Sequence, residues 1–504
     1  MPRFVMSHRR AGRFRVEEKL ASRAAMAFSV QRVGDLSATN VLYDNLPADD
    51  LARRTVVFEA DAGQLAGLAA AAAAFDSDVI IEPELLRWPS IVVPAQFREL
   101  QGPAATALAP AGTGRTFIVQ ALSAGMPLAQ ATVYLFLQGS GTNRTALIGE
   151  TDVTGTVTFD HSAYWLPAAV MVAPYANAWG TVVRGDSTPL VVECEPLPAG
   201  PFAPWWHEVL RLDAAESSRG TAIRVGVCDT GCGPHGGLAH RVDAGAFIGG
   251  AHYPGAGADV ESHGTHVSGI IGGRSADTWN QGVSPASDLY VARVFPPGNG
   301  ASQADVSNAI DALSKLHRCD LINLSLGSSA PSEIERDAML DAFERGTLSI
   351  CAAGNDGGPV SYPASYDVAV AVSALGLSGW GPAEASANLD IPQYADRFGD
   401  ENLYLAGFSC FGNEIDVAGP GVGIVSTVPE RHGLEAPRAE MSGTSMASPA
   451  ICGALAALLA ADPDYRNLPR DSSRARRARS ILLKACREIG LDARYEGYGV
   501  PTLD

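Results

Sequence analysis

The chain has 504 residues, of which 46% are hydrophobic and only 18% are charged, and its formal net charge is −18. This length exceeds that of one ordinary core, so we expect two to four domains. The acidic balance argues against non-specific nucleic-acid binding, which requires a basic face, and it favours simple solubility.

The first segment of the chain carries no targeting signal that the sequence makes evident. Residues 1–20 contain basic side chains but lack the apolar core of about 7–15 residues that a secretory signal needs. The longest apolar run, at 65–75, is too short and too rich in alanine to span a bilayer. We therefore expect no membrane span and a cytoplasmic protein by default, with non-classical export left open.

A small α+β domain is predicted over residues 1–90. Val56, Val57 and Phe58 are typical of a strand, Asp61 can cap a helix that runs to about Phe75, and 78–83 returns as a second strand. Residues 91–112 are rich in Pro, Ala and Gly, which is typical of a linker.

Residues 113–200 change to short β-branched runs separated by turn residues. Seven such runs at regular spacing predict an antiparallel β-sandwich, and we see no catalytic constellation in them. The stretch 127–159 also resembles the carboxypeptidase regulatory-like, or transthyretin-like, sandwich modules. That resemblance implies a spacer or a binding domain.

From residue 201 to the end, apolar strands alternate with amphipathic helices. This pattern predicts an α/β domain with a mostly parallel, doubly wound sheet covered on both faces. Ligands bind at the carboxyl ends of the strands in such sheets, so polar residues at those ends are candidates for a site.

Four short stretches place polar residues at these ends. Asp229 in "CDTG" and Asn355 in "AAGND" follow buried strands, whereas His263 in "HGTHVSG" and Ser445 in "SGTSMASP" begin helices. A serine hydroxyl needs a base within hydrogen-bond reach, a histidine can be that base, and a buried carboxylate fixes its tautomer. The set therefore indicates nucleophilic acyl transfer.

The chain order Asp229, His263, Ser445 and the four stretches resemble the catalytic domain of the subtilisin family, the subtilases. "GVSPASDLYVARVF", "LINLSLGS", "FSCFGNEIDVAGPG" and "EGYG" extend the resemblance over residues 205–504. It implies a serine endopeptidase that cuts polypeptides through an acyl-enzyme. The alternative is a catalytically silent or permanently self-inhibited subtilase that serves as a binding scaffold.

The resemblance assigns roles by position. Asp229 orients the base, His263 is the base and acid, Ser445 is the nucleophile, and Asn355 and the Ser445 backbone N–H form the oxyanion hole. Two further stretches are implied to bind an extended substrate, with large apolar side chains preferred at P1. They are Ser325, Leu326 and Gly327 as a pairing strand, and Ala352, Ala353 and Gly354 as a pocket wall.

Other polar residues receive supporting roles. His266 is expected to be a packed helix histidine, and Asn323 and Thr444 to support the site. The intact histidine at 263, where the acid-active sedolisins carry Glu, implies a neutral-to-alkaline pH optimum. A zinc site at His263 and His266 is excluded because no third ligand is suggested.

No cofactor and no metal are predicted. Asp277 and Asn280 offer oxygen ligands in the loop where secreted subtilisins often hold calcium, but a calcium cage is not evident. The eight cysteines show no CxxC spacing, so we expect buried free thiols.

Residues 55–86 resemble the inhibitor I9-like propeptide of subtilases. The resemblance implies an intramolecular inhibitor whose tail, "EPELLRWPS", lies in the active site of a zymogen that cuts itself near Arg87–Ile91. A sandwich between propeptide and protease departs from the family arrangement, which leaves self-processing open. The connection at 376–407 is long, and we expect either a lid or a surface that contacts the N-terminal domains.

Overall fold

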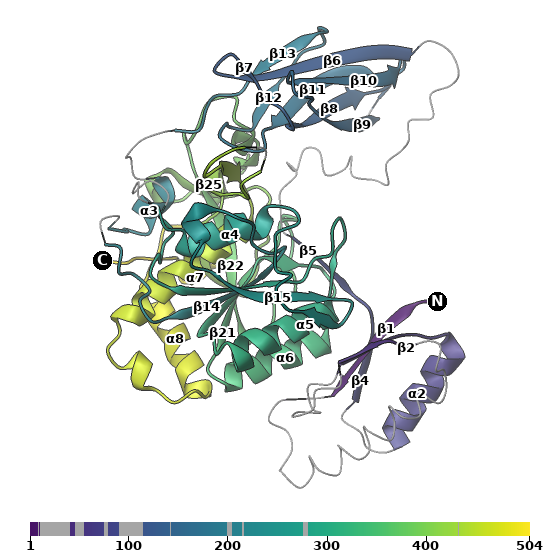
Figure 1. Ribbon diagram of the computed structural model, residues 1–504. Coiled ribbons are helices and arrows are strands. Elements are labelled where there is room, and N and C mark those ends of the chain that lie inside the picture. Colours follow the sequence, from purple (N-terminus) through teal and green to yellow (C-terminus); the bar gives the residue numbers. More distant parts are fainter. Residues whose placement is uncertain are drawn as a thin grey trace.

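The computed structural model describes residues 1–8, 10, 41–45, 55–74, 79–89, 114–141, 143–198, 204–213, 216–275, 281–431 and 433–504. These residues form three folded parts, which we call the N-terminal sheet (1–83), the two-sheet unit (114–193) and the C-terminal domain (204–504). Figure 1 shows the two-sheet unit above the C-terminal domain and the N-terminal sheet below and to the right. The predicted linker 91–112 lies outside the described residues.

The N-terminal sheet is antiparallel, with the strand order β2-β3-β1-β4. Asp61 and Gln64 cap the helix reciprocally through two hydrogen bonds of 2.9 Å, as the sequence predicts for Asp61. The elements are β1 (Arg3–His8), β2 (Val41–Asp44), β3 (Thr55–Glu59), α2 (Ala62–Ala74) and β4 (Val79–Pro83). Phe75, where the helix was expected to end, lies outside the described residues.

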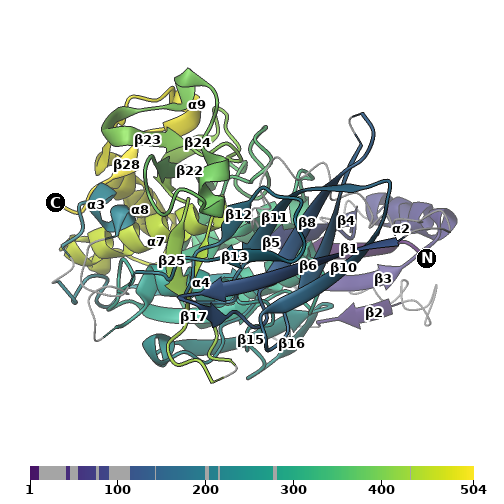
Figure 2. The same cartoon turned by 90° about the horizontal axis from the view of Figure 1, so that it is seen from above.

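The two faces of this sheet are both apolar because alternate residues point to opposite sides. Phe4, Met6 and Phe58 pack with Leu68 of α2 on one face. The other face packs against the C-terminal domain, through Val5, Val57, Ile80, Ala304 and Ile334. Figure 2 accordingly shows the N-terminal sheet beside the C-terminal domain when the molecule is seen from above.

The two-sheet unit consists of two four-stranded sheets around one apolar core. One sheet has the order β10-β6-β13 with β7 on β6, and the other has the order β12-β11-β8-β9. All seven predicted runs form strands, but β13 pairs with β6 in parallel, so the unit is not purely antiparallel. The strands are β6 (Gly114–Ser123), β7 (Met126–Pro127), β8 (Thr132–Gln138), β9 (Arg144–Glu150), β10 (Thr156–Ser162), β11 (Leu166–Ala173), β12 (Thr181–Val183) and β13 (Leu190–Glu193).

The connection at 376–407 contacts the two-sheet unit. Val182 N–H donates to Glu384 O at 2.9 Å, and Ser386 N–H donates to Gly180 O at 2.7 Å. The Trp380 ring stacks edge-on against Trp179, with 5.9 Å between the ring centroids. The expected contact surface is therefore present, and it fixes the two-sheet unit on the C-terminal domain.

The C-terminal domain is built on a nine-stranded sheet with the order β16-β15-β17-β14-β19-β21-β22-β23 and with β24 also on β22. Only β16 and β23 pair antiparallel, so the mostly parallel sheet is as predicted. The strands are β14 (Arg224–Asp229), β15 (Val242–Ile248), β16 (Ala251–Tyr253), β17 (Asp288–Arg293), β19 (Leu321–Leu324), β21 (Leu348–Ala352), β22 (Ala369–Leu377), β23 (Leu403–Leu405) and β24 (Ile415–Pro420).

Helices cover both faces of this sheet (Figure 1). Val225 and Val227 of β14 face a core with α4, α7 and α8, whereas Cys228 faces a core with α5 and α6. The helices are α3 (Trp205–Val209), α4 (His263–Gly272), α5 (Gln303–Asp311), α6 (Glu333–Glu344), α7 (Thr444–Ala461), α8 (Ser472–Lys484) and α9 (Ala493–Glu496).

Short strands lie outside the main sheet. Two of them, β18 (Ala301–Ser302) and β20 (Leu326–Gly327), flank β5 (Leu86–Pro89), which follows the N-terminal sheet directly. The others form the pairs β25 (Ile424–Thr427) with β26 (Arg438–Met441), and β27 (Cys486–Arg487) with β28 (Val500–Pro501).

One described helix, Thr444–Ala461, is long and apolar enough to cross a membrane, but 83% of it is buried inside the protein. It is the central helix of the C-terminal domain. Seven of the eight cysteines are buried free thiols, and Cys486 is half-buried, so the cysteine prediction holds for seven.

Candidate active site

Asp229 and His263 meet at the carboxyl end of β14. His263 lies in the first turn of α4, and its Nδ1 hydrogen-bonds to Asp229 Oδ1 at 2.6 Å. Both side chains are fully buried. His263 Nε2 has no hydrogen-bond partner among the described residues, so the ring presents its second nitrogen to a reactant.

The environment of His263 favours its protonated form. Burial opposes the charge, but the charge and hydrogen bond of Asp229 outweigh burial, and Asp259 and Glu261 add to them. The pKa of His263 is therefore raised above that of a free histidine. His263 is therefore neutral, and able to accept a proton, only when the pH lies above this raised pKa.

Asp259 fixes the start of α4, which the sequence reasoning did not anticipate. Its carboxylate accepts hydrogen bonds from the backbone N–H groups of Ser262 and Thr265, both at 2.8 Å. Ser262 has a φ of 79°, in the left-handed region that non-glycine residues rarely adopt. The only signal in the sequence is an acid shortly before a helix that begins at His263.

The Cα of Gly264 allows α4 to approach the loop after β14. A Cβ at this position would lie 2.1 Å from the carbonyl oxygen of Gly231. The close approach keeps His263 within reach of Asp229, so glycine is required here for packing.

Ser445 lies in the first turn of α7, which packs against α4. Its Oγ donates to the backbone oxygen of Ser325 at 3.0 Å, and no hydrogen bond joins it to His263 in the described part of the chain. Its backbone N–H belongs to the first turn, where donors have no acceptor within the helix. Ser325 Oγ in turn donates to the Ser445 backbone oxygen at 2.9 Å.

Asn355 is oriented by Thr444. The Asn355 Oδ1 atom accepts from the Thr444 backbone N–H at 2.9 Å and from its hydroxyl at 2.8 Å. This arrangement assigns the oxygen end of the amide and directs the NH₂ end away from Thr444. Asn323, predicted to support the site, accepts from Ser448 Oγ at 2.8 Å and donates to Ser325 Oγ at 2.9 Å.

The predicted substrate strand is already paired in the chain. Leu326 and Gly327 of β20 pair antiparallel with Pro89 and Trp88 of β5. On its other side, β5 pairs antiparallel with β18. The chain's own segment thus occupies the middle position of a three-stranded sheet next to Ser445 and Ser325.

The profile of the Subtilase family matches residues 220–499. The chain belongs to the subtilase family. Its enzyme class is therefore that of the serine-type endopeptidases.

Several known subtilases are similar to this chain. It is 31% identical to subtilisin Savinase from Lederbergia lenta over 268 residues. The match covers 53% of this chain and 87% of that protein. Over 271 residues it is 31% identical to the minor extracellular protease Epr from Bacillus subtilis, and this match spans only 37% of Epr.

Among solved structures, fervidolysin from Fervidobacterium pennivorans, a keratinolytic enzyme related to subtilisin, shares the fold. The TM-score is 0.58 at 19% identity, over 100% of this chain and 60% of that one.

The remaining predicted subtilase site residues line the end of β21. Ala352 and Ala353 are buried, and Gly354 N–H donates to Thr444 Oγ1 at 3.1 Å. Gly354 has a φ of 106°, and a Cβ there would lie 2.3 Å from Ser361 Oγ. Only glycine fits this position, which lies between the end of β21 and Asn355 and bonds to the Thr444 that orients Asn355.

His266 has a different environment from His263. Its Nε2 hydrogen-bonds to the backbone oxygens of Ile424 and Ala439 at 3.1 and 3.0 Å. Burial lowers the pKa of His266 to about 3. It is thus a neutral donor that ties α4 to the β25–β26 pair.

Asp277 and Asn280 lie outside the described residues. Within the described ranges, no group of three or more His, Cys, Asp or Glu side chains is placed to hold a metal ion.

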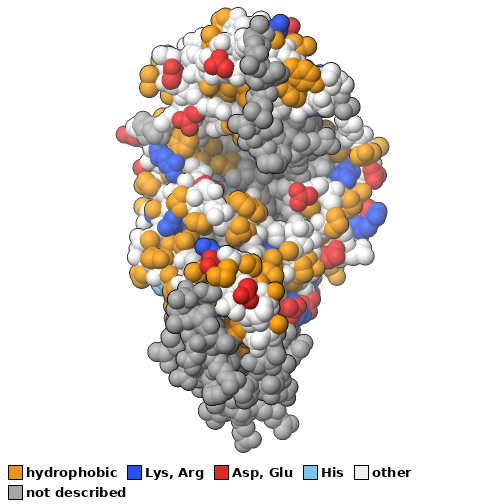
Figure 3. Space-filling model, turned by 90° about the vertical axis from the view of Figure 1, so that its right-hand side faces the viewer, with side chains coloured by type: hydrophobic (Ala, Val, Ile, Leu, Met, Phe, Trp, Pro, Cys, Tyr) orange, Lys and Arg blue, Asp and Glu red, His pale blue; other side chains and the backbone are white. Residues whose placement is uncertain are grey.

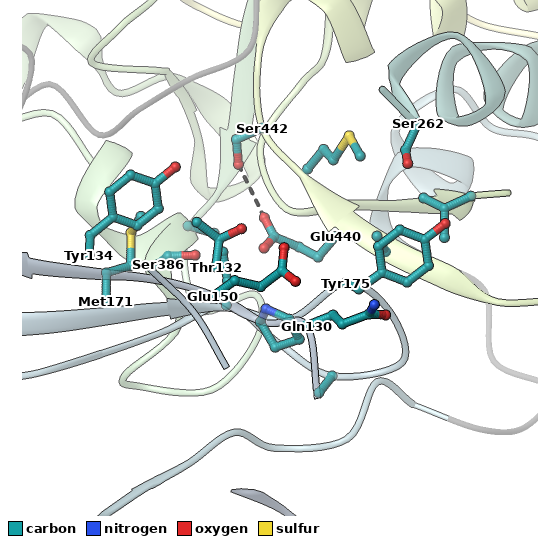
Figure 4. A pocket seen from close by; sticks show the side chains of 18 of the residues that line it. Gln130, Thr132, Tyr134, Glu150, Met171, Tyr175, Ser262, Ser386, Glu440 and Ser442 are labelled. Atoms are coloured by element: carbon teal, nitrogen blue, oxygen red, sulfur yellow. Dashed lines mark hydrogen bonds between the residues drawn. The ribbon is translucent and has the colours of Figure 1, made fainter. Parts of the chain in front are cut away.

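A pocket of about 510 Å³ lies between the two-sheet unit and the subtilase domain, beside the start of α4. The face in Figure 3 is hollowed between these two parts. Burial raises the pKa of Glu440, which faces this pocket, to about 7, and Ser442 Oγ donates to its carboxylate at 3.3 Å (Figure 4). The labelled lining residues are Gln130, Thr132, Tyr134, Glu150, Met171, Tyr175, Ser262, Ser386, Glu440 and Ser442.

Proposed function

We propose that the chain hydrolyses peptide bonds through an Asp229–His263–Ser445 triad and an acyl-enzyme. The observation that carries the proposal is the 2.6 Å bond between Asp229 and His263 Nδ1, which leaves Nε2 as the proton acceptor. The position of Ser445 in the first turn of α7, packed against α4, supports it.

In this mechanism Ser445 Oγ attacks the scissile carbonyl carbon while His263 Nε2 takes its proton. The Ser445 backbone N–H and the Asn355 amide donate to the oxyanion. His263 then gives the proton to the leaving amine, and a water molecule, activated by the same nitrogen, hydrolyses the ester. Asp229 stays ionised and stabilises the imidazolium.

In this mechanism the Ser445 hydroxyl exchanges its acceptor, from Ser325 O to His263 Nε2. Ser445 Oγ donates to Ser325 O at 3.0 Å, and rotation about one side-chain bond redirects the hydroxyl. Hydrogen bonds of a catalytic group are often incomplete before substrate binds.

The N-terminal sheet is proposed as an intramolecular inhibitor, and the chain as a zymogen that cuts itself near Arg87–Ile91. Support comes from β5, which holds the strand position expected of a substrate between β18 and β20. Glu82 also accepts from Ile334 N–H at 2.7 Å and from Ser332 Oγ at 3.1 Å, at the N-terminus of α6. Residues 90 and 91 lie outside the described residues.

The alternative is a subtilase that stays self-inhibited and acts as a scaffold. The occupied position of β5 favours it, because a substrate strand needs the same partners.

Two measurements decide between these proposals. A fluorophosphonate probe should label wild type but not Ser445→Ala, and absence of labelling in wild type would favour the scaffold. N-terminal mapping by mass spectrometry should find a cut near Arg87–Ile91 in wild type and an intact Ser445→Ala chain. An active wild type with an intact N-terminus would refute self-processing alone.

A further inference from the structure

A buried ion pair lies where β5 crosses the C-terminal domain. Arg87 donates from Nε to Glu335 Oε1 at 3.0 Å and from Nη2 to Oε2 at 2.7 Å, and both side chains are 0% exposed. Nη1 donates to the Ala330 backbone oxygen at 2.9 Å and also to Ser328 Oγ. The guanidinium is thus bound along two edges, which is a geometry specific to arginine.

Every acceptor of this pocket belongs to the C-terminal domain. Glu335 lies in the first turn of α6, where its backbone N–H donates to the Ser332 cap at 3.1 Å. Burial opposes the charge of Arg87, but the charge and hydrogen bonds of Glu335 outweigh it, so the pKa of Arg87 is raised. When β5 leaves, the pocket therefore keeps its acceptors, including the Glu335 carboxylate.

A buried carboxylate without a partner is strongly unfavourable. A strand that replaces β5 and carries an arginine at the same position restores the pair. A strand with a neutral residue there leaves Glu335 unpaired. The pocket therefore discriminates among strands by more than shape.

The register relates this pocket to Ser445. Arg87 pairs with Ala301, Trp88 with Gly327 and Pro89 with Leu326. The next residue of the antiparallel partner is Ser325, whose oxygen accepts from Ser445 Oγ at 3.0 Å. A substrate strand in this register presents the third residue after its arginine to the nucleophile.

The C-terminal domain constrains the neighbouring positions of β5 less strictly. Trp88 is 50% exposed, because alternate side chains of a strand point to opposite sides. The arginine position is the one that the C-terminal domain encloses.

We infer that Glu335, with Ser328 and Ala330, forms a subsite that selects polypeptide substrates with arginine at the fourth residue before the scissile bond. This inference rests on the proposed endopeptidase function. It extends that function from a reaction class to a substrate class.

The test uses the full-length chain with Arg87→Ala, which removes the competing guanidinium. Matched peptides carry arginine or its neutral isostere citrulline at the fourth position before the bond. Because a broken buried charge pair changes binding strongly, kcat/KM should be at least about 30-fold higher for arginine. Adding Glu335→Gln should reduce that ratio to near one, whereas Glu333→Gln, at an exposed acid in the same helix turn, should preserve it.

A binding measurement separates this inference from the proposed function. The two peptides are titrated by calorimetry into full-length Arg87→Ala, Ser445→Ala, which cannot turn over. Tighter binding of the arginine peptide by about 30-fold or more supports the subsite, and equal binding of the two peptides overturns it without any Glu335 variant. Absent fluorophosphonate labelling of the Arg87→Ala chain would instead refute the endopeptidase.

Discussion

The contact of Glu82 with α6 allows a quantitative test of how firmly β5 is held. Glu82 lies at the end of β4, and its carboxylate accepts from Ile334 N–H at 2.7 Å and Ser332 Oγ at 3.1 Å. Glu82→Gln keeps an acceptor of the same shape but removes the charge at the positive end of the helix. Glu82→Ala removes the acceptor as well.

The two variants should form a graded series. Burial raises the pKa of Glu82 in spite of these hydrogen bonds, so the charge itself adds little, and Glu82→Gln should change the opening equilibrium by no more than about twofold. Ser332 still caps α6 in Glu82→Ala, but Ile334 N–H loses its acceptor, which is worth about 2 kcal/mol, or roughly thirtyfold.

The assay is amide hydrogen exchange of β5 and β20 in the full-length Ser445→Ala chain, in which self-cleavage cannot interfere. Protection of the Trp88 and Gly327 amides should fall by these factors. Glu59→Gln is the matched control, because Glu59 forms only a partly exposed ion pair with Arg3 at 3.6 Å within the N-terminal sheet. Unchanged protection in Glu82→Ala would refute the idea that the contact of Glu82 with α6 holds the strand in place.

Three further predictions follow from the site and its surroundings. Asp229→Asn should lower kcat/KM by about 10⁴ at neutral pH. Because Asp229 raises the pKa of His263, wild-type activity should fall as pH drops through that raised pKa, and in Asp229→Asn the residual activity should persist to lower pH. Gly264→Ala, whose Cβ would meet a backbone oxygen at 2.1 Å, should lower the free energy of unfolding by about 1–3 kcal/mol in urea titrations. Burial raises the pKa of Glu440 to about 7, so the folded state binds its proton more tightly and stability falls as pH rises from about 4.5 to 7; Glu440→Gln should remove this decline in thermal unfolding.

The elements that hold Asp229 and His263 could be predicted because their signals are local. A buried apolar strand that ends in "CDTG" and a helix that starts at "HGTHVSG" each place one side chain at the edge of a parallel sheet. Asn355 and Ser445 follow from the same reasoning.

The features that the sequence did not reveal depend on distant residues. Arg87 and Glu335 are 248 positions apart, and neither stands out in its own segment. β13 pairs with β6 in parallel, although the residue pattern of these strands is like that of strands that pair antiparallel. The contact of Ser445 Oγ with Ser325 O depends on how α7 docks beside β19, which no local pattern specifies.

The covalent connection of β5 to the rest of the chain has a kinetic consequence. If β5 is the proposed inhibitor, it competes with substrates at an effective concentration on the order of millimolar while the connection is intact, whatever the amount of protein present. A cut between β5 and the two-sheet unit turns that contact into an ordinary bimolecular equilibrium, in which the released N-terminal sheet dissociates on dilution. The two-sheet unit stays attached to the C-terminal domain after such a cut, so dilution would release the N-terminal sheet alone.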